Sequence, residues 1–179
     1  MEKSKKVSSE ILGANPWWKY VHDKYSLPSG KEGDYYYGET AGLGCSMVIP
    51  ILDDGRLLLT VQFRYLRDKR SVEFPCGGLS GPEETPSAAA VRELLEETGY
   101  KSSDIIKIGE FDGLNGLFKD TTHVFIAREL ERVGEQNLDE SEDIELIYRR
   151  PDEFEDIIKR GEIWDGQTLA AWAIVRDNL

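Results

Sequence analysis

The sequence is poor in the residues that disulfide frameworks and soft-metal sites require. Its 179 residues include two cysteines, Cys45 and Cys76, and two histidines, His22 and His123. Two cysteines cannot build a disulfide framework, and zinc sites usually combine several cysteine and histidine ligands. We therefore expect any metal in this protein to be bound by oxygen atoms.

Long apolar runs and net positive charge are also missing. No stretch approaches the roughly 18 apolar residues that span a bilayer, and residues 1–18 lack the apolar centre of a signal peptide. The net charge of −12 argues against binding to nucleic-acid backbones, which requires clustered lysine and arginine. We expect a cytoplasmic protein that binds neither nucleic acid nor membrane.

Hydrophobic periodicity and turn residues predict an α+β protein. Thr85 is a typical N-cap, Pro86 suits the first helical position and Gly99 is a typical C-terminal stop, so a helix is predicted at 86–98. Further helices are predicted at 151–160 and 166–176. Strands are predicted at 45–51, 56–63, 71–74, 104–110, 121–128 and 143–149. This order indicates a central mixed β-sheet with helices on its faces, an α/β/α sandwich.

The N-terminal part is rich in aromatic residues. Residues 17–25 and 34–38 flank the turn-forming stretch LPSGKEG, which predicts an antiparallel β-hairpin ahead of the main domain. We expect the boundary near residues 39–42, which divides the chain into an N-terminal β extension, 1–40, and a main domain, 41–179.

Glutamates are concentrated on the helix predicted at 86–98. At 100° per residue, Glu93, Glu96 and Glu97 lie together on the face opposite the apolar residues. We expect this carboxylate face to point outward and the apolar face to pack; the apolar face consists of Ala90, Val91, Leu94 and Leu95. Such a face is usually only solvated, but it also suits Mg²⁺, which takes one or two carboxylates together with water and phosphate oxygens.

The residues around this helix decide between the two interpretations. Gly78, Glu84 and the run from Arg92 to Gly99 have the spacing of the Nudix box at every defining position, so the chain resembles the Nudix hydrolases. The resemblance implies a Nudix fold, with Mg²⁺ or Mn²⁺ bound by Glu93, Glu96, Glu97 and the carbonyl of Gly77. Arg92 lies one turn before Glu96 and can reach Glu84, so we expect it to hold the preceding loop against the helix.

The segments flanking the box are similar to one branch of this family. VQFRY at 61–65, SVEFPCGG at 71–78 and GEIWDGQTLAAWAI at 161–174 resemble enzymes that cleave ADP-ribose and nucleotide sugars. The resemblance implies hydrolysis of a nucleoside diphosphate sugar to a nucleoside monophosphate and a sugar phosphate, with Arg64 and Glu73 at the substrate. Hydrolysis of dinucleoside polyphosphates or nucleoside triphosphates, and nucleotide-sugar sensing without cleavage, are the alternatives.

The general base of the reaction is expected on a loop after the box. In the resembling enzymes this base is a glutamate, and residues 138–146 offer both Glu140 and Glu142. The sequence does not choose between them. Glu93 and Glu97 are expected to take part in catalysis through the metal that they bind.

The aromatic residues of the N-terminal extension allow two interpretations. Trp17, Trp18 and Tyr20 offer flat, rigid surfaces on which a nucleobase can stack, but aromatic residues also dominate cores and interfaces. In the resembling family such N-terminal strands are exchanged between subunits. The resemblance therefore implies a homodimer whose two sites share residues across the interface.

Overall fold

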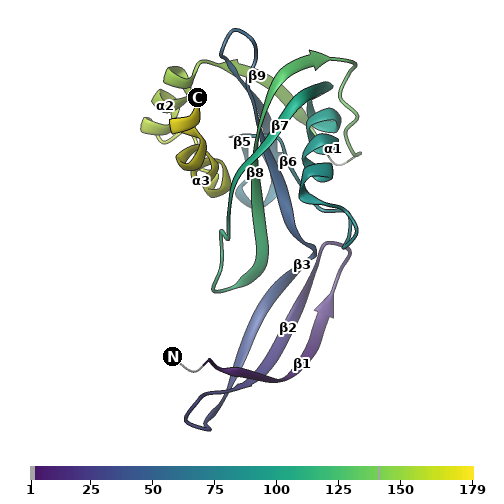
Figure 1. Ribbon diagram of the computed structural model, residues 1–179, viewed down its shortest axis with the longest axis vertical. Helices are drawn as coiled ribbons and strands as arrows, with labels where there is room; N and C mark the ends of the chain where they lie inside the picture. The colour runs from purple at the N-terminus through teal and green to yellow at the C-terminus, as the bar shows by residue number, and fades with distance from the viewer. Residues whose placement is uncertain (1–2, 141) are drawn as a thin grey trace.

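The computed structural model describes residues 3–140 and 142–179, which form two β-sheets between helices (Figure 1). The larger sheet has the order β1-β2-β3-β8-β7, and the short strand β6 also pairs with β3. It is mixed, because β3 and β8 are parallel whereas the other pairs are antiparallel. Its strands are β1 (Lys5–Ala14), β2 (Trp18–Ser26), β3 (Glu32–Pro50), β6 (Cys76–Gly78), β7 (Tyr100–Phe111) and β8 (Phe118–Arg132).

The smaller sheet is antiparallel and has the order β5-β4-β9. Its strands are β5 (Lys69–Glu73), β4 (Leu57–Arg64) and β9 (Ile144–Arg149), with a 3₁₀ turn, η1 (Tyr65–Arg67), between β4 and β5. The predicted sheet layer therefore exists, and it consists of two sheets.

Helices cover both sides of this sheet layer. α1 (Pro86–Thr98) lies on one side, and α2 (Pro151–Lys159) and α3 (Gly166–Val175) lie on the other, where a short 3₁₀ turn, η2 (Arg176–Asn178), ends the chain (Figure 1). The predicted α+β class with helices flanking a mixed sheet is confirmed. None of the helices in the described part of the chain is long and apolar enough to cross a bilayer.

Two apolar clusters hold the layers together. In the main cluster, the ring of Phe154 on α2 lies 5.3 Å from that of Phe74 and 4.9 Å from that of Trp172, centroid to centroid. The second cluster packs Ala90 and Leu94 of α1 against the larger sheet. Because these side chains are almost fully buried, they fix α1 rigidly on the sheet.

The bounds predicted for α1 are confirmed, and its capping residues act locally. The hydroxyl of Thr85 accepts a hydrogen bond from the Ala88 amide at 3.2 Å. Gly99 ends the helix with φ of 73°, a left-handed conformation that glycine adopts readily. A Cβ atom at Gly99 would lie 2.4 Å from the Gly134 carbonyl oxygen, so the chain approaches this residue too closely for a side chain.

The orientation predicted for α1 is wrong at three positions. Val91 is 47% exposed, whereas Glu93 and Glu97 are only 8% and 3% exposed. The reason is that α1 packs against β6 as well as against β3 and β7 of the same sheet. The backbone of β6 lies against the Glu93 carboxylate at Gly77 and against Glu97 at Cys76. Glu96 remains at the edge, with 37% of its side chain exposed.

The N-terminal residues project from the body as a three-stranded extension (Figure 1). The predicted hairpin is confirmed, because β2 pairs with β3 from Trp18–Thr40 to Ser26–Glu32. β1 adds a strand that the sequence did not predict. β3 continues through the boundary expected at residues 40 and 41, and its pairing with β8 shifts register between Glu39 and Gly44.

Candidate active site

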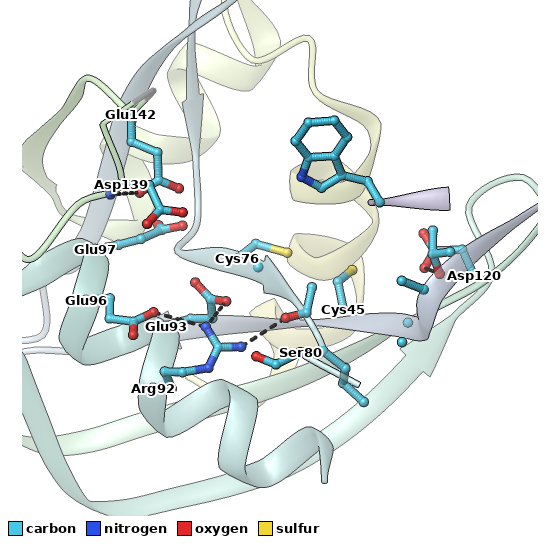
Figure 2. A pocket seen from close by; sticks show the side chains of 18 of the residues that line it. Cys45, Cys76, Ser80, Arg92, Glu93, Glu96, Glu97, Asp120, Asp139 and Glu142 are labelled. Carbon is cyan, nitrogen blue, oxygen red and sulfur yellow. Dashed lines mark hydrogen bonds and ion pairs between the residues drawn. The ribbon is translucent and has the colours of Figure 1, made fainter. Parts of the chain in front are cut away.

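A cavity of about 640 Å³ opens where the extension meets the body. It is lined by residues from both parts: the turn between β1 and β2, the middle of β3, β6, α1, the loop after β8 and the start of α3. Figure 2 shows Glu93, Glu97 and Glu142 at one side of this cavity and Asp120 at the other. The cavity therefore brings together residues that lie far apart in the sequence.

Arg92 fixes the loop before α1, as predicted. Its guanidinium donates to both carboxylate oxygens of Glu84, at 2.9 and 3.1 Å, and to the carbonyl of Gly78 at 2.9 Å. Glu84 also accepts a hydrogen bond from the Ser80 amide at 2.7 Å. Arg92 and this amide lower the pKa of Glu84 to about 2. The ion pair between Arg92 on the helix and Glu84 in the loop thus holds the loop against α1.

The same guanidinium also balances two carboxylates of α1. Arg92 Nη1 lies 2.5 Å from Glu93 Oε1 and 3.0 Å from Glu96 Oε2. Across residues 3–140 and 142–179, no three acidic, histidine or cysteine side chains are already arranged as a set of metal ligands. Glu93 and Glu96 are therefore paired with Arg92 in this structure. To hold a divalent cation, their carboxylates would have to direct some of their oxygen atoms toward the cation.

Glu97 has no such partner. Its Oε2 atom is buried without a hydrogen bond to any described residue, and burial, together with the charges of Glu93 and Glu142, raises its pKa to about 9. Burial likewise raises the pKa of Glu93. Buried carboxylates that remain uncompensated are costly, and a hard divalent cation compensates them with oxygen ligands alone. The residues present therefore fit Mg²⁺ or Mn²⁺.

Gly77 brings backbone against this carboxylate cluster. A Cβ atom at Gly77 would lie 2.0 to 2.4 Å from the carboxylate atoms of Glu93, which leaves room for backbone only. Gly77 and Gly78 both line the cavity. The structure thus brings the predicted ligands Gly77, Glu93 and Glu97 together.

The two candidates for the general base occupy different positions. Glu142 lines the cavity, and its side chain accepts a hydrogen bond from the Asp139 amide at 2.9 Å. Its charge contributes to the raised pKa of both Glu93 and Glu97. Glu140 is exposed and does not line the cavity. Asp139 does line it, and the loop shows no periodicity that would single out this residue in the sequence.

Arg64 and Glu73 form an ion pair beside the cavity. Arg64 Nε donates to Glu73 Oε1 at 2.8 Å, and Nη2 contacts Oε2. Glu73 is 2% exposed, whereas Arg64 lines both this cavity and a neighbouring one of about 620 Å³. Glu73 is therefore buried on the side of Arg64 away from the cavity, and it restricts the direction of the Arg64 guanidinium.

The aromatic residues of the extension separate into two groups. Trp17 lines the cavity and is 74% exposed, and its amide and that of Trp18 each donate to Asn15 Oδ1 at 2.9 Å. Trp18 packs against the ring of Phe118 at 5.8 Å. Tyr20 stacks on a neighbouring tyrosine of the extension. Of the three predicted aromatic residues, only Trp17 lines this cavity.

Several cavity residues gave no signal in the sequence. Thr40 donates to Asp120 at 3.0 Å on the side opposite the glutamates. Cys45 and Cys76 both line the cavity as free thiols, and Cys45 Sγ lies 3.3 Å from a threonine hydroxyl. A hydrogen bond with Cys76 lowers the pKa of the Cys45 thiol, whereas this bond and burial raise the pKa of Cys76. Only the pairing of β3 with β6 reveals that the two cysteines are neighbours.

Comparison with known proteins agrees with this site. A profile of the NUDIX domain matches residues 44–172, so the chain belongs to the Nudix family. It is 33% identical to the ADP-ribose pyrophosphatase of Bacillus subtilis (strain 168), over 85% of this chain and 80% of that protein. It is also 33% identical to the methanol dehydrogenase activator of Bacillus methanolicus, over 94% of this chain and 90% of that protein.

A solved structure has the same fold. The crystal structure of an ADP compounds hydrolase superposes with a TM-score of 0.84, over 99% of this chain and 94% of that one. Its sequence identity of 19% limits this similarity to the fold. The match includes the extension as well as the body, because it spans nearly the whole chain.

Proposed function

We propose that this protein hydrolyses the pyrophosphate of nucleoside diphosphate sugars, ADP-ribose among them, and releases a nucleoside monophosphate and a sugar phosphate. The observation that carries the proposal is the convergence of Glu93, Glu97 and Glu142 on one side of a cavity of about 640 Å³. The similarity to an ADP-ribose pyrophosphatase over most of both chains supports it.

The reaction depends on a divalent cation, and we propose Mg²⁺ or Mn²⁺. Glu93, Glu96, Glu97 and the Gly77 carbonyl would hold it, which the oxygen-only donor set and the unsatisfied oxygen of Glu97 support. When bound, such a cation offsets the charge of phosphate oxygens and activates water. Arg92 donates to both Glu93 and Glu96 and so restricts the positions of their carboxylates at the cavity.

Glu142 is the proposed general base. A general base must reach the attacking water directly. Both glutamates are exposed, but Glu142 lines the cavity and Glu140 does not. In the proposed reaction a carboxylate oxygen of Glu142 accepts the proton of the water that attacks phosphorus. The Asp139 amide, which donates to this carboxylate, keeps the side chain directed into the cavity.

Arg64 and Trp17 are proposed to bind the substrate. The guanidinium of Arg64 can donate to diphosphate oxygens with the nitrogen that Glu73 leaves free, since arginine stays charged and binds phosphate in fixed geometry. Glu73 then acts by positioning Arg64. Trp17, held by Asn15 at the cavity mouth, offers an exposed indole face for the nucleobase.

We propose that two copies of the chain associate through residues 1–40, the N-terminal extension of the Nudix domain at 41–179. The extension exposes many large apolar side chains, which is unusual for a surface that stays in water. They include Val7, Ile11, Leu12, Tyr20, Tyr35 and Tyr36. In a dimer with exchanged strands, Trp18 and Tyr20 would contribute to the site of the partner. Light scattering coupled to gel filtration tests this; a monomer at micromolar concentration contradicts it.

The site also agrees with a reducing compartment, and we propose the cytoplasm. Both cysteines are free thiols although they are neighbours in one cavity. Disulfides persist in oxidising compartments and are rare in the cytosol. Fractionation of cells that express the protein, followed by immunodetection, would test the location.

A substrate panel tests the function. The protein is incubated with Mg²⁺ and ADP-ribose, GDP-mannose, other nucleotide sugars, dinucleoside polyphosphates and nucleoside triphosphates, and phosphate is measured with and without added phosphatase. We expect phosphate from nucleotide sugars only after phosphatase treatment, because the products are monoesters. Cleavage of triphosphates or dinucleoside polyphosphates without any sugar substrate would favour the other hydrolases, and tight binding without cleavage would favour a sensor.

A further inference from the structure

Cys45 and Cys76 occupy the floor of the cavity. Cys45 lies on β3 and Cys76 on β6, and Figure 2 shows both side chains between the glutamates and Asp120. Both thiols are free and both line the cavity. No step of the proposed reaction uses them, so their position needs a separate explanation.

The register of the two strands brings these thiols to the same face. Cys45 pairs with Gly78, and Cys76, two residues earlier on β6, points to the same side as Gly78. The hydrogen bond from the Leu79 amide to the Gly44 carbonyl, at 3.1 Å, makes Cys45–Gly78 a non-hydrogen-bonded pair, in which facing side chains lie closest. Because Gly78 has no side chain, the space opposite Cys45 is open to the Cys76 thiol.

The strand register and the shared cavity make the two cysteines a neighbouring dithiol. The interaction of the two thiols is also the largest cause of the changed pKa of both, lowering that of Cys45 and raising that of Cys76, which agrees with this arrangement.

We propose that Cys45 and Cys76 form a reversible disulfide with hydroperoxides, and that this bond switches the site off. The Cys45 sulfur attacks the peroxide O–O bond, gives a sulfenic acid and releases one water when the peroxide is H₂O₂. The Cys76 sulfur then attacks the sulfenic sulfur, the S–S bond forms, and the hydroxyl leaves with a proton as a second water. Two thiols are oxidised by two electrons and one peroxide is reduced.

The bond acts on the site through β6. Diagonal neighbours on paired strands have Cα atoms about 7 to 8 Å apart, whereas disulfides prefer about 4.4 to 6.8 Å. Closing the bond therefore draws Cys76 toward Cys45 and moves Gly77, whose backbone packs against the Glu93 carboxylate. A displacement of about 1 Å at a catalytic site lowers turnover by one to two orders of magnitude. This second part of the proposal rests on the proposed function.

The chemical part is tested by mass spectrometry and thiol titration. The full-length protein is treated with H₂O₂, the free thiols are counted, and peptides are mapped without reduction. We expect both thiols to disappear, the intact monomer to lose the mass of two hydrogen atoms, and one peptide pair to join Cys45 to Cys76. Free thiols that persist at peroxide doses that oxidise a reference dithiol overturn the proposal, and so does a bond between two chains.

The switch is tested by activity on ADP-ribose before and after peroxide, within each variant. We expect the wild-type protein to lose at least about tenfold in turnover and to recover with dithiothreitol, whereas Cys45→Ser and Cys76→Ser lose less than about twofold. An equal loss in the serine variants, or a disulfide without loss of turnover, overturns the switch. If the reduced protein cleaves no nucleotide sugar, the proposed function fails; the disulfide is then still judged by mass, and its effect on the site by the Mg²⁺-induced change in Tm.

Discussion

The cavity has two walls of different construction. The carboxylate wall consists of Glu93 and Glu97, which are buried and have a raised pKa, and of Glu142, which is exposed. The opposite wall, Trp17, Thr40 and Asp120, is more open, and its largest side chain is 74% exposed. The first wall gathers like charges that repel each other unless a cation is present. The second offers a flat ring and an acceptor to whatever enters.

This difference assigns separate tasks to the walls. Buried carboxyl groups are costly for folding once they ionise, and perturbed pKa values are common at functional sites, so we propose a role for the carboxylate wall in the chemical step. An exposed indole that is fixed through its backbone contributes contact area with little loss of conformational entropy. Changes in the carboxylate wall should therefore lower kcat, and changes in the opposite wall should mainly raise KM.

The largest effect is expected for Glu142→Gln. Loss of the general base should lower kcat about 10²- to 10⁴-fold without preventing metal binding. Glu140→Gln is the matched control, since it removes a glutamate from the same loop but outside the cavity, and should change kcat less than twofold. Steady-state kinetics on ADP-ribose measures both. The reverse ranking would show that the base is Glu140.

A loss of activity of about 10²-fold or more is expected for Glu97→Gln, with an opposite effect on stability. Glutamine cannot ionise, so as the pH rises toward 9 the metal-free variant should have a higher Tm than the wild type, whose Oε2 atom at this position has no hydrogen bond. Added Mg²⁺ should raise the Tm of the variant less than it raises the Tm of the wild-type protein. Glu83→Gln, an exposed change before the same helix, should alter neither quantity.

The stability of the metal-free protein should depend on pH through the same carboxylate. The pKa of Glu97 is raised to about 9 from 4.5, so the folded protein keeps a proton that the unfolded chain releases. Stability is then fully present below pH 4.5 and falls as the pH rises toward 9, by at most about 1.4 kcal/mol per pH unit for one proton. Thermal unfolding in EDTA from pH 5 to 9 measures this slope. An equal slope in Glu97→Gln would contradict the assignment.

An intermediate effect is expected for Arg92→Gln. The change leaves Glu84, Glu93 and Glu96 without their cation, and it should cost about 2 kcal/mol of unfolding free energy and about 10- to 100-fold in turnover. Arg160→Gln breaks an exposed ion pair with Glu162 and should leave the free energy of unfolding nearly unchanged, because water screens such pairs. Urea unfolding of both variants measures the difference, and equal costs would show that Arg92 has no structural role.

The smallest effect is expected in the opposite wall. Trp17→Ala should raise KM about tenfold with kcat and Tm nearly unchanged, because it removes the proposed stacking on the nucleobase while the exposed indole contributes little to the core. Trp18→Ala should instead lower Tm, since Trp18 packs on Phe118. If Trp17→Ala lowered kcat without changing KM, the expectation that the opposite wall acts mainly on KM would be wrong.

Sequence signals between neighbouring residues predicted the helix of the carboxylate wall well. The start and end of α1 follow from Thr85, Pro86 and Gly99, which act on neighbouring backbone groups, and the grip of Arg92 on Glu84 follows from their spacing. These contacts lie within the 23 residues from 78 to 100, so their geometry is set by one loop and one helix.

Contacts between distant segments were not predictable. The spacing of 100° per residue placed Val91 inside and Glu93 outside. It takes no account of the backbone of β6, a strand of three residues that packs on this helix. β1 was missed because all its residues are exposed and show no alternation of buried and exposed positions. In the opposite wall only Trp17 was predicted. Thr40 and Asp120 were not, because they meet only where β3 runs beside β8.

The length of β3 has a mechanical consequence. Its 19 residues span about 60 Å at roughly 3.3 Å per residue, from the tip of the extension to the centre of the body. The strand departs from regular pairing with β8 only between Glu39 and Gly44, and Thr40, Ala41 and Gly42 within this stretch border the cavity. Because β3 is one continuous strand, the extension and the body are joined at the cavity through this single irregular stretch of backbone.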